Sequence, residues 1–173
     1  MQAKKTQDTV VFKTNWFDLV ARKSDDSPHP YYVMNSPDFA AVIAFDDAGN
    51  LLLVRQYRHG VQAETLELPS GHVEAGETPE QAARKELLEE TGYVADHFEL
   101  LAELSPSTGR FSNRIWCYLA RNARPEPCVA IESGMELVIY RKGLRALVEE
   151  KEFCNAVQYG ALAVALLSGK ISA

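Results

Sequence analysis

The stretch GHVEAGETPEQAARKELLEETGY, from Gly71 to Tyr93, decides how this chain is interpreted. It begins with a glycine turn and continues into a helix whose two ends are marked. Thr78 is a good N-cap, Pro79 suits the first helical position, and Gln81 completes a capping box with Thr78. Gly92 supplies the left-handed residue with which many helices end. We therefore expect a helix between these marks.

Three glutamates of this expected helix, Glu86, Glu89 and Glu90, lie on one face because they are spaced i, i+3 and i+4. Like charges at these spacings destabilise a helix by roughly 0.2–0.5 kcal/mol per pair unless something compensates them. Clustered carboxylate oxygens are the ligands that hard divalent cations such as Mg²⁺ select. The pattern predicts a metal site, with a solvated acidic face as the alternative.

The composition is that of an ordinary globular protein with one domain. The chain has 173 residues, of which 46% are hydrophobic and 24% charged. Its formal net charge of −6 argues against non-specific binding to nucleic acid, which depends on basic patches. We therefore expect no nucleic-acid partner. A nucleotide remains compatible with this charge, because a metal ion can neutralise its phosphates.

The cysteines and the N-terminus indicate the cellular compartment. Cys117, Cys128 and Cys154 are odd in number, widely spaced and without a C-x-x-C pattern, so we expect reduced thiols. The first ten residues have no apolar signal core, and no apolar run approaches the 18 residues that a membrane span needs. These features predict a cytoplasmic protein without a membrane partner.

The rest of the chain predicts a mixed sheet with few helices, an α+β fold. Alternating and apolar runs predict strands before the decisive stretch at residues 9–13, 16–22, 31–34, 39–46, 51–58 and 65–68. After it, we expect strands at 97–104, 113–121 and 135–140, and helices at 143–150 and 155–167. The polar loop 105–112 is long enough to line a site, and a second loop is expected from Arg124 to about Gly134.

The decisive stretch resembles the signature of the Nudix hydrolases. In that signature a Gly and, six residues later, a Glu are followed by Arg-Glu-aliphatic-x-Glu-Glu-x-Gly-aliphatic; here Gly71, Glu77 and the run KELLEETGY (85–93) stand at these places. Lys85 replaces the Arg, and Tyr93 replaces the last aliphatic residue. The resemblance covers roughly residues 39 to 168. Within it, VRQYR (54–58) and ELPSG (67–71) look like the branch that acts on ADP-ribose and other nucleoside diphosphate sugars.

This resemblance implies an α/β/α sandwich with a mixed sheet and an N-terminal antiparallel strand segment. We expect one domain over residues 1–173, with the catalytic core at 37–173 and with strands in 1–36 that form a homodimer. The implied reaction is Mg²⁺-dependent hydrolysis of a small nucleotide-sugar substrate into two monophosphates, with Mn²⁺ as a possible substitute. The alternatives are a GDP-sugar, a dinucleoside polyphosphate or a nucleoside triphosphate as substrate, or a nucleotide-sugar sensor that does not hydrolyse its ligand.

The resemblance also implies which residues hold the metal. Glu86, Glu89 and Glu90 match the family's metal-binding glutamates, and the backbone carbonyl of Ser70 matches a further ligand. The glutamates count as catalytic residues as well, because the bound ion offsets the charge of the diphosphate and lowers the pKa of a water. Lys85 keeps the positive charge of the signature Arg but lacks its planar two-pronged contact.

A general base is expected from a loop after the signature helix, as in relatives of this branch. We assign Glu132 to this role, with Glu136 or a glutamate of the signature helix as alternatives. Arg55 and Arg58 match basic positions that hold phosphates or the terminal ribose. Arg110 is the third predicted substrate contact.

The loop that contains Arg110 departs from the family pattern. Many relatives have Ser-Pro-Gly followed by acids, where this chain has Ser-Pro-Ser-Thr-Gly-Arg. This difference leaves the sugar and the base open. Trp16 is expected in the core or at an interface, with stacking of Trp16 or Phe17 on adenine as the alternative.

Overall fold

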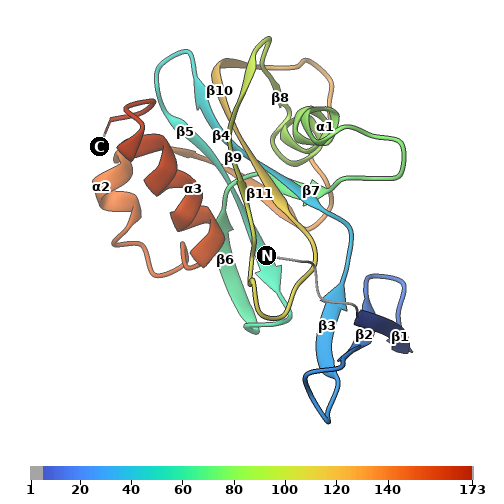
Figure 1. The fold of residues 1–173 in the computed structure, drawn as a ribbon. Coiled ribbons are helices and arrows are strands. Elements are labelled where there is room, and N and C mark those ends of the chain that lie inside the picture. Colours follow the sequence, from blue (N-terminus) through green and yellow to red (C-terminus); the bar gives the residue numbers. More distant parts are fainter. Residues whose placement is uncertain (1–5, 173) are drawn as a thin grey trace.

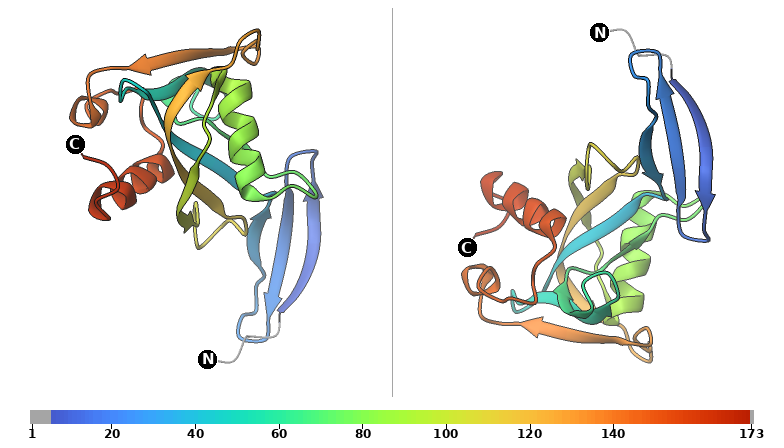
Figure 2. Two further views of the ribbon diagram at one scale, coloured as in Figure 1. Left: turned by 90° about the horizontal axis from the view of Figure 1, so that it is seen from above. Right: turned by 90° about the horizontal axis from the view of Figure 1, so that it is seen from below.

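Two β-sheets and three helices make up the fold of the computed structural model, which describes residues 6–172 (Figure 1). The smaller one, the N-terminal sheet, is antiparallel and consists of β1 (Thr6–Lys13), β2 (Asp18–Ser24) and β3 (Tyr31–Asn35). It projects from one end of the molecule in both views of Figure 2. Residues 1–5 and 173 of the predicted domain lie outside the described residues.

The N-terminal sheet is attached to the rest of the chain through Met34. The amide of Met34 donates to the carbonyl of Arg110 at 2.7 Å, and the amide of Ser112 donates to the carbonyl of Met34 at 3.1 Å. The predicted strand at 16–22 starts two residues late because the Thr14 hydroxyl oxygen accepts from the amides of Trp16 and Phe17. These bonds form a turn that keeps both aromatic residues out of β2.

The main sheet is mixed, as predicted. Its path is β11-β5-β4-β10-β8, with β6 paired to β5, β7 to β4 and β9 to β10. Only β4 and β10 run parallel among the described pairs. Its strands are β4 (Phe39–Asp46), β5 (Leu51–Arg58), β6 (Ala63–Glu67), β7 (Ser70–His72), β8 (Tyr93–Val94), β9 (Phe98–Leu104), β10 (Ile115–Pro125) and β11 (Met135–Tyr140).

Strands β4 and β5 pair only near their shared hairpin, at Ala44–Leu52 and Phe45–Leu51. Beyond these pairs they diverge, and each takes a different partner: β5 pairs with β6, and β4 pairs with β7. The chain crosses the opening at Pro69, whose carbonyl accepts from the amide of Val42 at 2.9 Å. The sheet is therefore split where the chain enters the decisive stretch.

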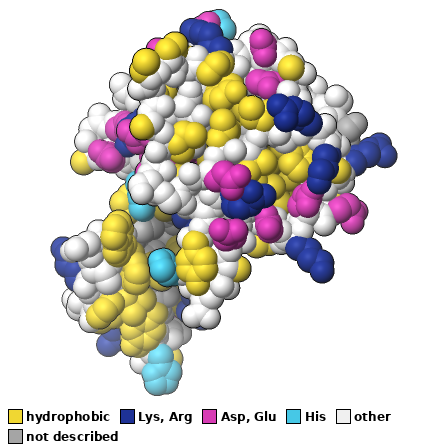
Figure 3. Space-filling view, turned by 180° about the vertical axis from the view of Figure 1, so that it is seen from behind, with side chains coloured by type: hydrophobic (Ala, Val, Ile, Leu, Met, Phe, Trp, Pro, Cys, Tyr) yellow, Lys and Arg dark blue, Asp and Glu magenta, His cyan; other side chains and the backbone are white. Residues whose placement is uncertain are grey.

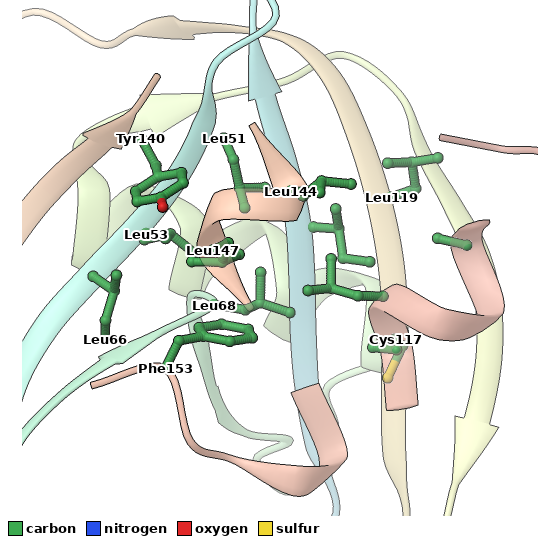
Figure 4. Packing of buried hydrophobic residues seen from close by; sticks show 14 residues of the cluster. Leu51, Leu53, Leu66, Leu68, Cys117, Leu119, Tyr140, Leu144, Leu147 and Phe153 are labelled. Carbon is green, nitrogen blue, oxygen red and sulfur yellow. The ribbon is translucent and has the colours of Figure 1, made fainter. Parts of the chain in front are cut away.

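Helices cover both faces of the main sheet, which gives the predicted sandwich (Figure 2). Helix α1 (Pro79–Thr91) lies on one face, and α2 (Leu144–Leu147) and α3 (Ala156–Leu167) lie on the other. Leu87 of α1 and Phe153 beside α3 are buried in the two separate cores; the second core is drawn in Figure 4. Burying one such side chain stabilises the fold by roughly 1.5–3 kcal/mol. No helix among residues 6–172 is long and apolar enough to cross a membrane.

The predicted ends of α1 are confirmed. The hydroxyl of Thr78 accepts from the amide of Gln81 at 3.2 Å, and the side chain of Gln81 accepts from the amide of Thr78 at 2.8 Å. Gly92 ends the helix with φ of 70°, in the left-handed region.

Other boundaries were also predicted wrongly, among them the first strand, which starts at Thr6 and not at residue 9. Strand β10 does not end at residue 121: Arg124 and Pro125 pair with Val94 and Tyr93, so the second loop begins later than expected. The strand passes a register shift at Asn122, which has φ of 53° and interrupts the alternating pattern. The helix expected at 143–150 is only the single turn α2, because it starts at a glycine without a side-chain cap and continues in i to i+3 turns.

Candidate active site

Two buried glutamates of α1 lie against the opening of the main sheet. Glu90 is 2% exposed, and its Oε2 accepts from the amide of Ser70 at 2.8 Å. Glu86 is 8% exposed, and its carboxyl group fills the space above Gly71. A Cβ at Gly71 would lie 2.3 Å from that carboxyl, so only glycine allows this close approach.

Burial changes the protonation of both side chains. Burial raises the pKa of Glu90 to about 8, although the amide of Ser70 opposes this shift. Burial likewise raises the pKa of Glu86 to about 7, with Lys85 opposing it. The negative charge of Glu132 adds to both shifts, and that of Glu89 adds to the shift of Glu86. Near neutral pH Glu90 is therefore mostly protonated and Glu86 about half protonated unless a cation compensates them.

The loop before β11 brings Glu132 to this place. The amide of Glu132 donates to the carbonyl of Glu89 at 2.9 Å, and the amide of Glu126 donates to the carbonyl of Gly92 at 2.8 Å. Both bonds tie the loop to the C-terminal end of α1. Glu136, the alternative base, instead forms an ion pair with Arg55 at 2.9 Å. We call Glu86, Glu89, Glu90 and Glu132 the carboxylate cluster.

The donor chemistry of the carboxylate cluster fits a hard divalent cation. Its atoms are carboxylate oxygens, two of the side chains are buried, and their pKa values are raised chiefly by burial and further by the neighbouring carboxylates. Across residues 6–172, no three or more His, Cys, Asp or Glu side chains are already gathered closely enough to hold a metal ion.

Lys85 supports the cluster from one side. Its Nζ lies 3.0 Å from Glu74 Oε1, 3.5 Å from Glu77 Oε2 and 3.8 Å from Glu86 Oε1. The lysine thus connects Glu86 to the turn before α1. Arg84 does not take over this role, because it faces another direction and bonds to Glu80.

A cavity of about 660 Å³ lies beside Ser70, on the side of the sheet covered by α3. Arg58 lines it and donates from Nε and Nη2 to the two carboxylate oxygens of Glu67, each at 2.8 Å. Glu67 is 4% exposed and also accepts from Thr65 Oγ1 at 2.6 Å and from Gln158 Nε2 at 3.4 Å. This network fixes the guanidinium group of Arg58 at the cavity wall.

Aromatic side chains from three parts of the chain line the same cavity, which we call the aromatic cavity. Phe39 comes from β4, Phe111 from the 105–112 loop, and Trp16 and Phe17 from the turn after β1. Trp16 is 72% exposed, so its expected place in the core is wrong. The N-terminal sheet instead brings it to the rim of the cavity.

The other two predicted arginines lie outside the lining of the aromatic cavity. Arg55 is held by Glu136 at 2.9 Å and by Glu152 at 3.2 Å. The guanidinium of Arg110 lies 4.9 Å from the ring centre of Tyr31 and lines a separate cavity of about 490 Å³. Of the three, the structure brings only Arg58 to the cavity beside Ser70.

The structure adds cavity residues that the sequence did not reveal. Asn113 and Gln158 both line the aromatic cavity and are 4% and 3% exposed. Asn113 lay within a predicted strand and Gln158 within a predicted helix. A single polar residue in such an element does not indicate that it lines a cavity. The polarity of the loop 105–112 was the nearest hint to Asn113.

Comparisons with known proteins agree with this fold and with the resemblance of the sequence to the Nudix hydrolases. Residues 34–138 match the family described as the NUDIX domain, which is more than half of the chain. The chain is 34% identical over 88 residues to the ADP-ribose pyrophosphatase of Bacillus subtilis, covering 51% of this chain and 48% of that protein. It is 32% identical over 94 residues to the 8-oxo-dGTP diphosphatase of Escherichia coli, covering 54% and 73%.

The chain spans about half the length, or less, of most of the curated relatives that it matches. Among solved structures, a crystal structure of an ADP compounds hydrolase superimposes with a TM-score of 0.81 at 24% identity. That superposition covers 98% of this chain and 97% of the other, so the two share a fold along their whole length.

Proposed function

Because this chain belongs to the NUDIX family, we propose that it hydrolyses the diphosphate bond of an ADP-ribose-like nucleoside diphosphate sugar into two monophosphates. One observation carries the proposal: Ser70 donates to Glu90 of the carboxylate cluster and also lines the aromatic cavity. Carboxylates suit a metal-bound diphosphate, and an aromatic cavity suits a nucleoside. The name of the Bacillus subtilis relative agrees with this substrate class.

The proposed metal ligands are Glu86, Glu89, Glu90 and the backbone carbonyl of Ser70, and the proposed ion is Mg²⁺, which Mn²⁺ can replace. A bound ion offsets the charge of the diphosphate and lowers the pKa of a water. The two buried glutamates supply the negative charge that such an ion requires once its binding displaces their protons. Lys85 restrains Glu86, because its Nζ lies 3.8 Å from Glu86 Oε1.

Glu132 is the proposed general base, which accepts the proton of the attacking water. Two observations support it: its amide is bonded to the carbonyl of Glu89, and its charge acts on both buried glutamates of α1. Glu136 is engaged with Arg55, which argues against the main alternative.

Arg58 is the proposed phosphate contact. Its fork to Glu67 holds the guanidinium group at the cavity wall before substrate arrives, which reduces the entropy lost on binding. Arg55 and Arg110 have other partners, so their predicted roles are secondary in this proposal.

The proposal includes a homodimer that forms through the N-terminal sheet, within a single domain over residues 1–173. Val10, Val11 and Phe12 of β1 are each about half exposed, and hydrophobic side chains gather over this sheet in the lower part of Figure 3. Exposed apolar patches of this kind commonly mark protein interfaces. The three cysteines are free thiols, which suits the proposed location in the cytoplasm.

Hydrolysis of a nucleoside triphosphate is a second candidate. The 8-oxo-dGTP diphosphatase of Escherichia coli is similar over 73% of its own length, a larger share than for the Bacillus subtilis relative. Both candidates use the same carboxylate cluster, and a substrate panel distinguishes them.

The test is product analysis after incubation of the wild-type protein with Mg²⁺ and a panel of substrates. The panel contains ADP-ribose, a GDP-sugar, a dinucleoside polyphosphate and 8-oxo-dGTP. We expect AMP and ribose 5-phosphate from ADP-ribose. Glu90→Gln is expected to lower the rate by roughly a thousandfold, whereas Glu149→Gln, at an exposed site on the other side of the sheet, retains it. If the wild-type protein hydrolyses none of these compounds, the proposal is overturned, and the sensor alternative gains support only if they bind.

A further inference from the structure

Gln158 connects α3 to the short segment with which the chain crosses the opening of the main sheet. This crossing segment consists of Leu68 and Pro69, which lie between β6 and β7. The amide of Leu68, a fully buried residue, donates to Gln158 Oε1 at 2.8 Å. Since Leu68 lies outside both strands, the side chain of Gln158 replaces the partner that a neighbouring strand would supply. The crossing segment therefore depends on a residue that is 90 positions away in the sequence.

The surroundings of the Gln158 side chain require both an acceptor and a donor. Its Oε1 faces the amide of Leu68, which is a donor. Its Nε2 lies 3.4 Å from Glu67 Oε2 and 3.5 Å from the carbonyl oxygen of Leu68, which are both acceptors. These two contacts are long and therefore weaker than the first. A carboxamide fits this arrangement, whereas an ionised carboxylate offers only acceptors and a methionine only a weak one.

The two ends of the carboxamide lead to different parts of the site. The bond to the crossing segment holds the chain two residues before Ser70, whose carbonyl is a proposed metal ligand and whose amide donates to Glu90. The contact with Glu67 leads to Arg58, since Glu67 accepts from two nitrogens of that guanidinium group at 2.8 Å each. The chain at Ser70 is therefore held by α1 on one side and by α3 on the other.

Gln158 is itself firmly placed, because it lies in the first turn of α3. Its amide donates to the carbonyl of Asn155 at 3.1 Å, and Asn155 Oδ1 caps the helix by accepting from the amide of Val157 at 3.0 Å. The residue is 3% exposed, which leaves its side chain little freedom to rotate. Residues that orient the groups around a metal in this way commonly affect metal affinity and activity without contacting the ion.

Resting on the proposed function, we propose that Gln158 is a positioning residue of the active site. It sets the place of the Ser70 carbonyl through the crossing segment and the place of the Arg58 guanidinium through Glu67. Its effect is indirect, because it acts through these neighbours. One side chain of α3 thus supports both the metal site and the phosphate contact, from the face of the main sheet opposite α1 (Figure 2).

Two substitutions separate the two connections. Gln158→Met keeps the length of the side chain and removes both of them. Gln158→Glu keeps an acceptor for the amide of Leu68 but replaces the donor to Glu67 by a second carboxylate. Binding of Mn²⁺ to the substrate-free protein is measured by electron paramagnetic resonance, and KM and kcat are measured with ADP-ribose and Mg²⁺.

The two variants should differ in their effects on the metal. We expect Gln158→Met to weaken Mn²⁺ binding by about tenfold or more, as loss of such supporting bonds commonly does, and also to raise KM. Gln158→Glu should bind Mn²⁺ at least as tightly as wild type, because it keeps the bond to the crossing segment. Its KM should rise by about tenfold, the effect of losing one hydrogen bond to a charged group.

A variant of the next residue in α3 separates positioning from a general structural role. The hydroxyl of Tyr159 donates to the carbonyl of Phe153 at 2.7 Å, and neither residue lines the aromatic cavity. Tyr159→Phe therefore removes a bond that holds α3 without touching the crossing segment. We expect this variant and Gln158→Met to melt at a lower temperature than wild type, whereas only Gln158→Met changes Mn²⁺ binding and KM.

Three outcomes would overturn the inference. The first is a less stable Gln158→Met that binds Mn²⁺ and substrate as wild type does, since Gln158 would then be only structural. The second is an equal loss of Mn²⁺ affinity in Tyr159→Phe. The third is an unchanged KM in Gln158→Glu, which also decides the case if Gln158→Met does not fold. Mn²⁺ binding by a wild-type protein that hydrolyses no substrate would overturn the proposed function and leave the comparison of Mn²⁺ affinities intact.

Discussion

The carboxylate cluster and the aromatic cavity meet at Ser70 but are built in different ways. The cluster lies mainly on one helix, where two of its three glutamates are buried, and a single glycine leaves room for one of these two. The cavity is assembled from the N-terminal sheet, five strands of the main sheet (β4, β5, β6, β7 and β10), the loops beside them and α3. The first region therefore tolerates little change in shape, whereas the second can change its lining one residue at a time.

This contrast predicts different consequences for variants of the two regions. A change in the carboxylate cluster should lower kcat for every substrate alike. A change in the cavity should mainly alter KM and the ratio between substrates. The four tests below run from the largest expected effect to the smallest.

Gly71→Ala should have the largest effect. The added Cβ would lie 2.3 Å from the carboxyl group of Glu86 and would push it out of place without removing any carboxylate. Since misplacement of a catalytic group by about 1 Å commonly costs about a hundredfold, we expect kcat to fall by at least about that factor. Steady-state kinetics with Mg²⁺ measure this. Gly160→Ala is the control, because a Cβ there meets Leu104 Cδ1 at an ordinary 3.6 Å and Gly160 lies outside the lining of the aromatic cavity. Equal activity of the two variants would contradict the required close approach.

Arg58→Ala should affect both stability and binding. Loss of the guanidinium leaves Glu67 buried without its ion-pair partner. We expect the free energy of unfolding to fall by roughly 2–3 kcal/mol, which is less than for a fully buried pair because Arg58 itself is partly exposed. KM should rise while kcat changes less. Denaturant unfolding and kinetics measure the two effects.

The double variant Arg58→Ala with Glu67→Gln separates these two effects. It removes the unpaired charge, so stability should recover in part, whereas KM should stay high. If KM recovered together with stability, Arg58 would be a structural residue and not a phosphate contact.

The metal-free protein should lose stability as pH rises. The folded-state pKa values of Glu86 and Glu90, about 7 and about 8, lie above the ordinary value of 4.5. The folded state therefore binds more protons than the unfolded state. The resulting stabilisation is fully present below pH 4.5 and is lost as pH rises through 7 and 8.

Melting temperatures in EDTA measure this effect at pH 6 and pH 8.5. We expect a decrease of several degrees at the higher pH, at about 2–4 °C per kcal/mol. Mg²⁺ should reduce the difference, since it binds the ionised carboxylates. Glu67 does not contribute in this range, because its pKa is lowered and it stays ionised throughout. A melting temperature that did not change with pH in EDTA would contradict the burial of the two glutamates as acids.

Trp16→Ala should have the smallest effect on the stability of the protein, and it should selectively weaken substrate binding. At 72% exposure its removal should change stability by no more than about 0.5 kcal/mol. If Trp16 stacks on the base, KM should rise about tenfold with kcat unchanged. Val148→Ala, an exposed apolar residue away from the cavity, is the control. A fall in kcat without a change in KM would contradict stacking on the base and would indicate that Trp16 acts on the chemical step.

The difference between the two regions also explains what the sequence revealed. Helix α1 was predictable because Thr78, Gln81 and Gly92 act on their near neighbours, and three of the glutamates follow one helical face. The ion pairs of Arg55 were not predictable, because its partners Glu136 and Glu152 are 81 and 97 residues away. The place of Asn113 in the cavity lining was not predictable either, because it also depends on segments that are distant in the sequence. Its place at the cavity depends on a parallel pairing between β10 and β4 that no short pattern encodes.

The attachment of the N-terminal sheet through Met34 has a mechanical consequence. Met34 both donates to the 105–112 loop and accepts from it, and that loop carries Phe111 in the cavity wall. The N-terminal sheet is therefore coupled to the cavity wall through these two hydrogen bonds. A partner that tilts β1 and β2 would move Phe17 and Phe111 together and so adjust the width of the opening from a distance.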